Sequence, residues 1–192
     1  EADWLFSVAT RVATVDGKAV HYPTPTKELV QALEARSETA ALRQLAEARR
    51  DLGDLQGALS ALEAWATAEG AEAWAEAGRW ASAQGQMAFA QRAAEKALPG
   101  LSPEQARALQ DERIAWAERA PGHADPLALR EARARAFPAD PRAVEDWIRG
   151  LEKAGRLDEA TAASRATECL PRERRVLLAS DLAADHGLAR KA

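Results

Sequence analysis

The sequence holds little of what disulfide-bonded, β-rich or membrane-spanning proteins need. Cys169 is its single cysteine, which excludes an internal disulfide framework. Only 3 Phe and 1 Tyr occur in 192 residues. Because strands favour aromatic and β-branched side chains, a large β-sandwich or barrel is disfavoured. No run approaches the roughly 20 apolar residues that a spanning helix needs. These absences predict an all-α protein with no direct membrane span.

The charges are nearly balanced, with 26 Lys and Arg against 30 Asp and Glu. This balance disfavours a nucleic-acid surface, so no nucleic-acid partner is expected. Alanine makes up a quarter of the chain, and most of the cations are arginine, which favours a bacterial source. The first residue is Glu1 rather than Met, which we expect of a processed product or of a piece excised from a longer protein. The compartment stays open between the periplasm or envelope and the cytoplasm.

Internal repeats are visible in the spacing of four glycines. Gly53, Gly85, Gly155 and Gly187 lie 32, 70 and 32 residues apart, and each is followed five residues later by alanine. The middle interval is about two further periods, so the spacing predicts five units. The predicted units cover about 39–70, 71–102, 103–140, 141–172 and a truncated 173–192.

Apolar residues follow a helical period on both sides of each glycine. Each unit is therefore predicted to be two helices, the first ending at the glycine because glycine accepts a positive φ. The units resemble tetratricopeptide repeats, in which helix A carries a large apolar residue early and a small one four places later, and helix B carries an alanine near its start. Trp74, Gly78 and Ala90 match this pattern best. The resemblance implies an all-α solenoid of helical hairpins with a groove lined by helix A.

The repeats are degenerate, since several positions depart from the family pattern. These positions are Arg49, Ala81, Ser164 and Thr167.

Capping residues predict three helix starts independently of the repeats. Proline follows Ser102, Asp125 and Asp140, a cap-then-proline signature that places helix starts at 103, 126 and 141. Gln105 can complete a capping box with Ser102. The third unit should then hold a long helix over about 103–119.

The two ends differ from the repeats. Residues 5–22 are rich in β-branched side chains around the turn signal Asp16-Gly17, so residues 1–25 are predicted to be an extended or hairpin segment. A first helix is the alternative, because Trp4, Val8 and Val12 also have i, i+4 spacing. The repeat domain should occupy 26–192, beginning with a helix at about 26–36. At the other end, 187–192 is predicted to be the start of a helix B that is cut off.

No residue spacing points to catalysis. His21, His123 and His186 are far apart and lack metal-binding spacing. Cys169 is predicted to be a structural thiol, and no phosphate-binding loop follows a strand. We therefore predict no enzyme, no metal and no cofactor.

The six tryptophans are the most informative side chains. Trp65, Trp74 and Trp147 occupy core positions of their repeats. Trp80 lies about 240° around the helix from Trp74, so it must meet another unit or face a groove. Its indole would then serve as an interface anchor.

The resemblance implies that a protein or peptide partner binds along helix A of the first two units. The candidate residues are Arg43, Gln44, Glu47, Arg50, Glu76, Arg79 and Trp80. Their mixed charge suits an extended polar peptide. The arginines between 130 and 142 lie among acidic residues, which favours intramolecular pairing over phosphate binding.

The predicted function is a protein–protein interaction scaffold, for example in a bacterial envelope or exopolysaccharide-export assembly. The alternative is a helical accessory domain of a larger enzyme whose catalytic part lies outside these residues. A homo-oligomer is left open.

Overall fold

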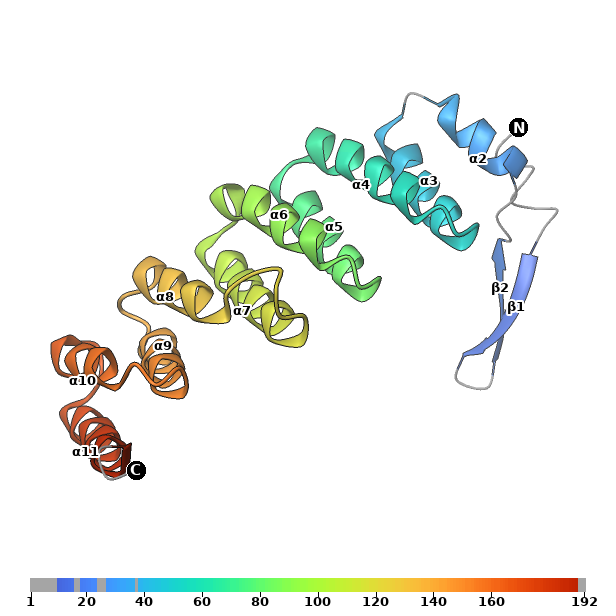
Figure 1. Ribbon diagram of the computed structural model, residues 1–192. Helices are drawn as coiled ribbons and strands as arrows, with labels where there is room; N and C mark the ends of the chain where they lie inside the picture. Colours follow the sequence, from blue (N-terminus) through green and yellow to red (C-terminus); the bar gives the residue numbers. More distant parts are fainter. Residues whose placement is uncertain (1–9, 16–17, 24–26, 37, 190–192) are drawn as a thin grey trace. The chain divides into compact units, whose positions relative to one another are not determined.

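The computed structural model describes residues 10–15, 18–23, 27–36 and 38–189. The chain divides into two compact units, Glu1–Leu101 and Ser102–Ala192 (Figure 1). The division falls between the second and third predicted repeats.

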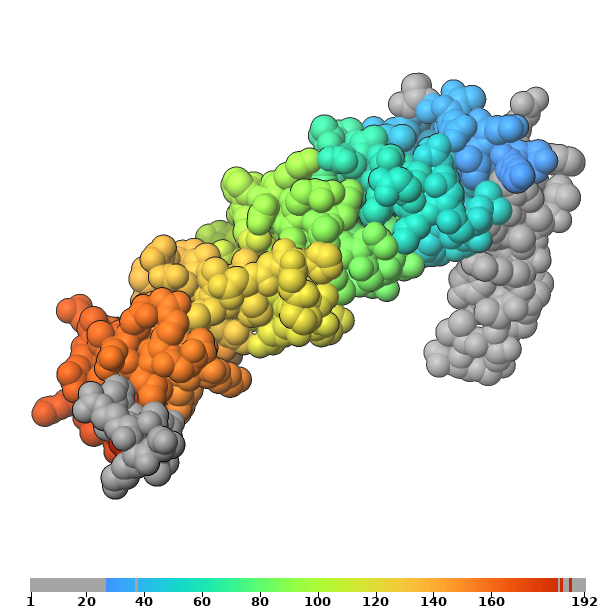
Figure 2. All heavy atoms as spheres, viewed as in Figure 1, coloured from blue at the N-terminus to red at the C-terminus, as the bar shows by residue number. Residues whose placement is uncertain are grey.

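Unit 1 is a series of helical hairpins. Its helices are α2 (Lys27–Glu34), α3 (Thr39–Asp51), α4 (Leu55–Glu69), α5 (Ala71–Ala83) and α6 (Met87–Ala97), followed by a 3-10 turn, η1 (Leu98–Gly100). The hairpins pair α3 with α4 and α5 with α6, and α4 lies against α5 (Figure 1). In Figure 2, the atoms of unit 1 from α2, in blue, to α6, in green, follow one another in chain order. The predicted helical-repeat fold is therefore confirmed in this unit.

Alanine explains how these helices approach closely. The completely buried alanines of unit 1 are Ala46, Ala58, Ala66, Ala77, Ala81, Ala90, Ala94 and Ala97. Their short side chains let helix backbones pack closely, while Trp65 and Trp74 fill wider gaps. Gly53 and Gly85 have φ of 84° and 73° at the hairpin turns, as the spacing predicts.

The segment before α2 contains a two-stranded antiparallel hairpin. Strand β1 (Thr10–Val15) pairs with β2 (Lys18–Pro23), with Val15 opposite Lys18. Over these residues the structure has the predicted hairpin, and Val12 lies in β1 rather than in a helix. The turn residues Asp16 and Gly17, together with Trp4 and Val8, lie outside the described residues.

Unit 2 contains five further helices in its described part. They are α7 (Pro103–Arg119), α8 (Pro126–Ala136), α9 (Pro141–Lys153), α10 (Leu157–Ala166) and α11 (Arg172–Ala189). The predicted starts at 103, 126 and 141 are confirmed. Ser102 and Gln105 form the expected capping box, and the Asp125 and Asp140 side chains accept backbone N–H groups at their helix starts.

The prediction at Gly187 is wrong. Helix α11 runs through Gly187 to Ala189, and Gly187 is not among the glycines with positive φ. Leu178 and Leu182 are completely buried and hold α11 against the core of unit 2. Since glycine inside a helix costs only about 1 kcal/mol relative to alanine, this packing carries the helix past it. No second helix starts at Gly187.

Candidate partner-binding surface

The predicted binding residues of α3 form a stripe along one side of the helix. Arg43, Glu47 and Arg50 follow one another at spacings of four and three, which places them on one face. Leu45 and Ala46 are buried on another face. The stripe is therefore open to solvent, with Arg43 exposed and the other two half-buried.

Two polar contacts join this stripe to α5 of the next hairpin. Arg43 forms an ion pair with Glu76. The indole Nε1 of Trp80 donates to Oε1 of Glu47 over 2.9 Å. Each pair is separated by 33 residues, so the stripes of α3 and α5 lie side by side as the repeat predicts.

Trp80 meets the preceding hairpin, as its position relative to Trp74 predicts. Its side chain is half-buried, and the guanidinium of Arg50 lies 5.9 Å from the ring centre. That distance permits a cation–π contact. The indole N–H of Trp80 is thus already bonded to Glu47 within unit 1.

A hollow of about 500 Å³ opens between α3 and α4. Its lining residues are Ala40, Arg43, Gln44, Glu47, Trp65 and Glu69. The Arg43 guanidinium lies 5.6 Å from the centre of the Trp65 ring. Arg43 is thus held from two sides, by Trp65 of α4 and by Glu76 of α5.

The structure divides the predicted residues into two groups. Three of them, Arg43, Gln44 and Glu47, line the hollow. The others, Arg50, Glu76, Arg79 and Trp80, are not among its lining residues. Arg79 is exposed on α5. Arg50 pairs with Glu47 and donates to Asp51.

The sequence pattern does not predict the contribution of α4 to this hollow. It places Trp65 in the core and gives no sign that Ala40 and Glu69 line a hollow. Arg43 and Trp65 are 22 positions apart, a separation that depends on how α4 folds back on α3. The helical period of apolar residues shows which residues share a face of one helix, and it does not predict contacts between two helices.

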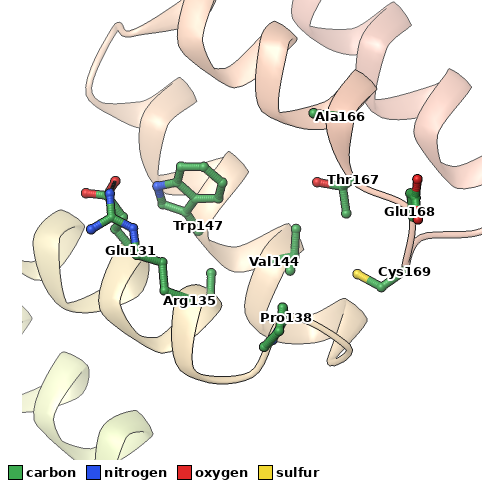
Figure 3. A pocket seen from close by; sticks show the side chains of 10 residues that line it. Glu131, Arg135, Pro138, Val144, Trp147, Ala166, Thr167, Glu168 and Cys169 are labelled. Atoms are coloured by element: carbon green, nitrogen blue, oxygen red, sulfur yellow. Dashed lines mark hydrogen bonds and ion pairs between the residues drawn. The ribbon is translucent and has the colours of Figure 1, made fainter.

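Unit 2 has a second hollow, of about 450 Å³, beside α8, α9 and the α10–α11 connection (Figure 3). Val144, Trp147 and Cys169 are among its lining residues. Arg135 donates to Glu131 at its edge over 2.6 Å. Cys169 is half-buried there.

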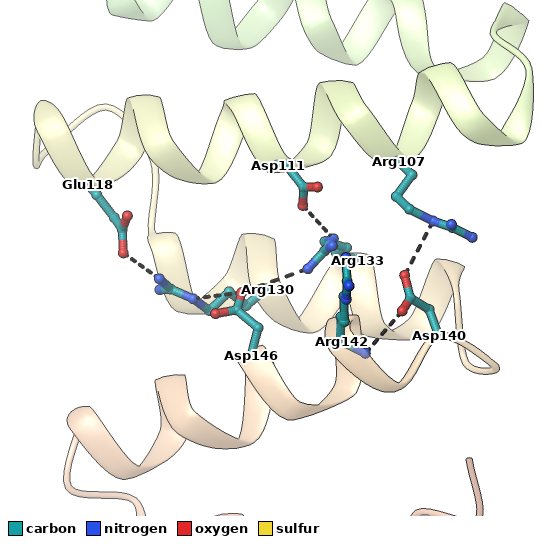
Figure 4. Close-up of polar contacts among 8 residues, drawn as sticks. All are labelled: Arg107, Asp111, Glu118, Arg130, Arg133, Asp140, Arg142 and Asp146. Carbon is teal, nitrogen blue, oxygen red and sulfur yellow. Dashed lines mark hydrogen bonds and ion pairs between the residues drawn. The ribbon is translucent and has the colours of Figure 1, made fainter. Parts of the chain in front are cut away.

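The arginines of α8 pair within unit 2, which confirms the intramolecular interpretation (Figure 4). Arg130 contacts Glu118 of α7 and Asp146 of α9. Buried Arg133 lies 2.7 Å from Asp111 of α7. Burial raises the pKa of the Asp111 carboxyl, and the charge of Arg133 opposes that rise. These arginines therefore connect three helices.

Within the described part of the chain, no group of three His, Cys, Asp or Glu side chains is placed to bind a metal ion. Over the same residues, no helix is both long enough and apolar enough to span a membrane. His123 is exposed between α7 and α8.

Among known proteins, similarity to this chain is found with solved structures. No family model matches the sequence, and no curated protein matches it. Among solved structures, the crystal structure of MamA is 14% identical, with a TM-score of 0.43, over 85% of this chain and 90% of that chain. A similarity of this size says nothing about function.

Proposed function

We propose that unit 1 binds an extended polar peptide segment of a partner protein in the hollow between α3 and α4. The helical-repeat fold supports a protein-interaction scaffold, and tetratricopeptide-like repeats are the family that its sequence pattern resembles. The observation that carries the proposal is Arg43, which is held between Trp65 and Glu76 at the edge of the hollow. A side chain positioned in this way loses less entropy when it binds.

The lining chemistry matches an extended peptide. The Gln44 amide can donate to a backbone carbonyl and accept from a backbone N–H. Glu47 and Glu69 can accept from a lysine or arginine of the peptide, and Arg43 can donate to a carbonyl or carboxylate. With one cation and two carboxylates in the lining, a segment that carries a basic residue fits best. A bacterial envelope assembly is the setting that the family resemblance suggests.

Gln44 is the best residue for a test. It is exposed and lines the hollow, whereas Arg50 contacts Glu47, Asp51 and Trp80. Charge reversal at Arg50 would disturb those contacts as well as any partner. Gln56 is an exposed glutamine on α4 outside the hollow, so Gln56→Lys is a matched control for Gln44→Lys.

The experiment selects twelve-residue peptides from a phage-displayed library on the whole chain. The selected peptides are then titrated by fluorescence anisotropy against the two variants. We expect Gln44→Lys to weaken binding at least tenfold, and Gln56→Lys to leave it unchanged. Selected peptides that bind both variants as tightly as the parent chain would place the binding site elsewhere.

A further inference from the structure

The side chain of Lys96 connects three helices of unit 1. Its Nζ lies 4.0 Å from the centre of the Trp74 ring on α5, a distance that permits a cation–π contact. The same Nζ lies 2.9 Å from Oε1 of Glu63 on α4. A lysine of α6 thus joins an aromatic ring of the preceding helix to a carboxylate of the helix before that.

Unit 2 repeats this hairpin with an offset of 70 residues. Helix α5 begins at Ala71 and α9 at Pro141. Both hairpins turn at a glycine with φ of 73°, Gly85 in the first and Gly155 in the second. Helix α8 packs against α9 as α4 packs against α5. Positions 70 residues apart therefore occupy the same place in the two hairpins.

This offset makes Val144 the counterpart of Trp74, and Ala166 the counterpart of Lys96. Both Val144 and Ala166 line the hollow of about 450 Å³ in unit 2. Ala166 lacks the four-carbon stem and the ammonium group that Lys96 carries. The hollow of unit 2 thus lies where unit 1 has a lysine side chain.

The hollow contains the groups that surround the cation in unit 1. Trp147 of α9 lies three residues after Val144, on the same side of the helix, and supplies an aromatic ring. Carboxylates come from Glu131 of α8 and from Glu168 in the α10–α11 connection. In Figure 3, Glu131 lies on the Trp147 side of the hollow and Glu168 lies on the other side. A ring and a carboxylate are thus present, as in unit 1, and the lysine is absent.

The charges of the lining favour a cation. They are the carboxylates of Glu131 and Glu168 and the guanidinium of Arg135, so the lining carries one more negative charge than positive. Arg135 donates to Glu131 over 2.6 Å, but its side chain is 78% exposed. Exposed pairs of this kind are weak, so Glu131 can also accept from a second cation. Glu168 is exposed at the opposite side.

The corresponding cleft of unit 1 is open to solvent, although the chain continues past it from α7 to α11. The side chains of Lys96 and Glu63 there are 49% and 51% exposed. Later helices of the repeat therefore leave this cleft uncovered. The exposure of the hollow in unit 2 is thus a property of its place in the hairpin, and it does not depend on where the chain ends.

We propose that the hollow beside α8, α9 and the α10–α11 connection binds a lysine side chain of a partner protein. The ammonium group contacts the ring of Trp147 and donates to Glu131 and Glu168, as Lys96 contacts an indole and a carboxylate in unit 1. The apolar stem lies against Val144, in the space left by the missing lysine. A protein is the source of the lysine that the helical-repeat fold favours. This site lies in unit 2 and is independent of the peptide site proposed for unit 1.

The probes are N-acetyl-lysine methylamide and N-acetyl-norleucine methylamide, which keeps the apolar stem and lacks the ammonium group. Each is titrated in the millimolar range against the whole chain labelled with ¹⁵N. Binding is followed by NMR through the indole N–H signal of Trp147, which Trp147→Phe assigns among the six indoles.

Two pairs of variants test the site. Ala166→Lys restores the lysine of unit 1, and Ala108→Lys adds the same charge at an exposed alanine of α7 outside the hollow. Glu168→Gln removes a carboxylate of the hollow. Glu173→Gln makes the same change at an exposed position of α11 that does not line it.

We expect the lysine probe to shift the Trp147 signal saturably, and the norleucine probe to bind at least tenfold more weakly. Ala166→Lys should abolish binding, because its own ammonium group then occupies the hollow, whereas Ala108→Lys should bind like the parent chain. Glu168→Gln should weaken binding and Glu173→Gln should leave it unchanged. Unchanged signals of the other indoles check that each variant folds.

The proposal is overturned if the lysine probe gives no saturable shift, or if Ala166→Lys binds it as tightly as the parent chain. Equal binding of the norleucine probe also overturns it, because the hollow would then select an apolar stem and not a cation. Spermidine serves as a third probe. If it binds at least tenfold more tightly than the lysine probe, the occupant is a free polyamine and the proposal is wrong.

Discussion

The indole N–H of Trp80 donates to the carboxylate of Glu47 over 2.9 Å, from one hairpin to the preceding one. The two residues are 33 positions apart, the same separation as Arg43 and Glu76 and as Glu63 and Lys96. This separation is one residue more than the 32-residue glycine spacing, and polar contacts that recur at it fix the offset between successive hairpins. In unit 1 the repeat is therefore maintained by side-chain contacts as well as by alanine packing.

The Trp80–Glu47 bond should be measurable as a coupling energy. Trp80→Phe removes the donor, Glu47→Ala removes the acceptor, and urea unfolding of the double variant completes the cycle. We expect a coupling of about 1 kcal/mol, the usual net value of one protein hydrogen bond. Trp80→Phe combined with Glu63→Ala on α4 should be additive within about 0.5 kcal/mol. Equal coupling in both cycles would show that the bond does not contribute specifically.

Two glycines that look equivalent in the sequence should respond oppositely to the same substitution. Gly155 has φ of 73° at a hairpin turn, so Gly155→Ala should destabilise the chain by about 1–2 kcal/mol. Gly187 lies within α11 and has open space where a Cβ would lie. Gly187→Ala should therefore be neutral or stabilise by up to about 1 kcal/mol. Thermal unfolding of both variants tests this. If Gly187→Ala is destabilised, the result would favour a turn, rather than a continuous helix, at that position.

This pair of glycines shows how far the sequence could predict the fold. The turns at Gly53, Gly85 and Gly155 were predictable, because glycine there is followed by a helix with alanine at a fixed place. Gly187 has the same spacing, but the packing of Leu178 and Leu182 decides that the helix continues. That packing depends on tertiary contacts, which a spacing rule does not contain.

The candidate site likewise has features that the sequence predicts and features that depend on tertiary packing. The stripe on α3 follows from the helical period, and its contact with α5 follows from the repeat length. The place of Trp65 beside Arg43 depends on the angle at which α4 returns along α3. The exposure of Val176 and Leu177 on α11 depends on which side of that helix packs against the core. Neither property is encoded in the spacing within one helix.

Gly78 should be intolerant of a larger side chain. It is buried on α5, the helix that packs between α4 and α6. Gly78→Leu should destabilise the chain by about 1–3 kcal/mol, because added methylenes force neighbouring helices apart. Ala83→Leu changes an exposed residue of the same helix and should stay within about 0.5 kcal/mol of the parent. Unchanged unfolding of Gly78→Leu would contradict the close packing of these helices.

The ion pair between Glu145 of α9 and Arg174 of α11 should make part of the stability of unit 2 dependent on pH. The hydrogen bond from Arg174 lowers the pKa of Glu145 below its usual 4.5, and partial burial opposes this only in part. A carboxyl whose pKa is lower in the folded state stabilises the fold above the unfolded pKa. That contribution is lost as the pH falls through the folded pKa.

Glu145→Gln tests this dependence because it keeps a hydrogen-bond acceptor and removes the charge. At pH 7 we expect the variant to be less stable by about 0.2–1 kcal/mol, since Arg174 is 44% exposed and solvent screens the pair. The difference should shrink as the pH falls through the lowered pKa of Glu145, because the parent carboxyl then becomes protonated. Glu168→Gln, at an exposed position in the α10–α11 connection, controls for the change in net charge. A difference between parent and Glu145→Gln that stays constant from pH 7 to pH 3 would mean that the charge of Glu145 does not stabilise the contact between α9 and α11.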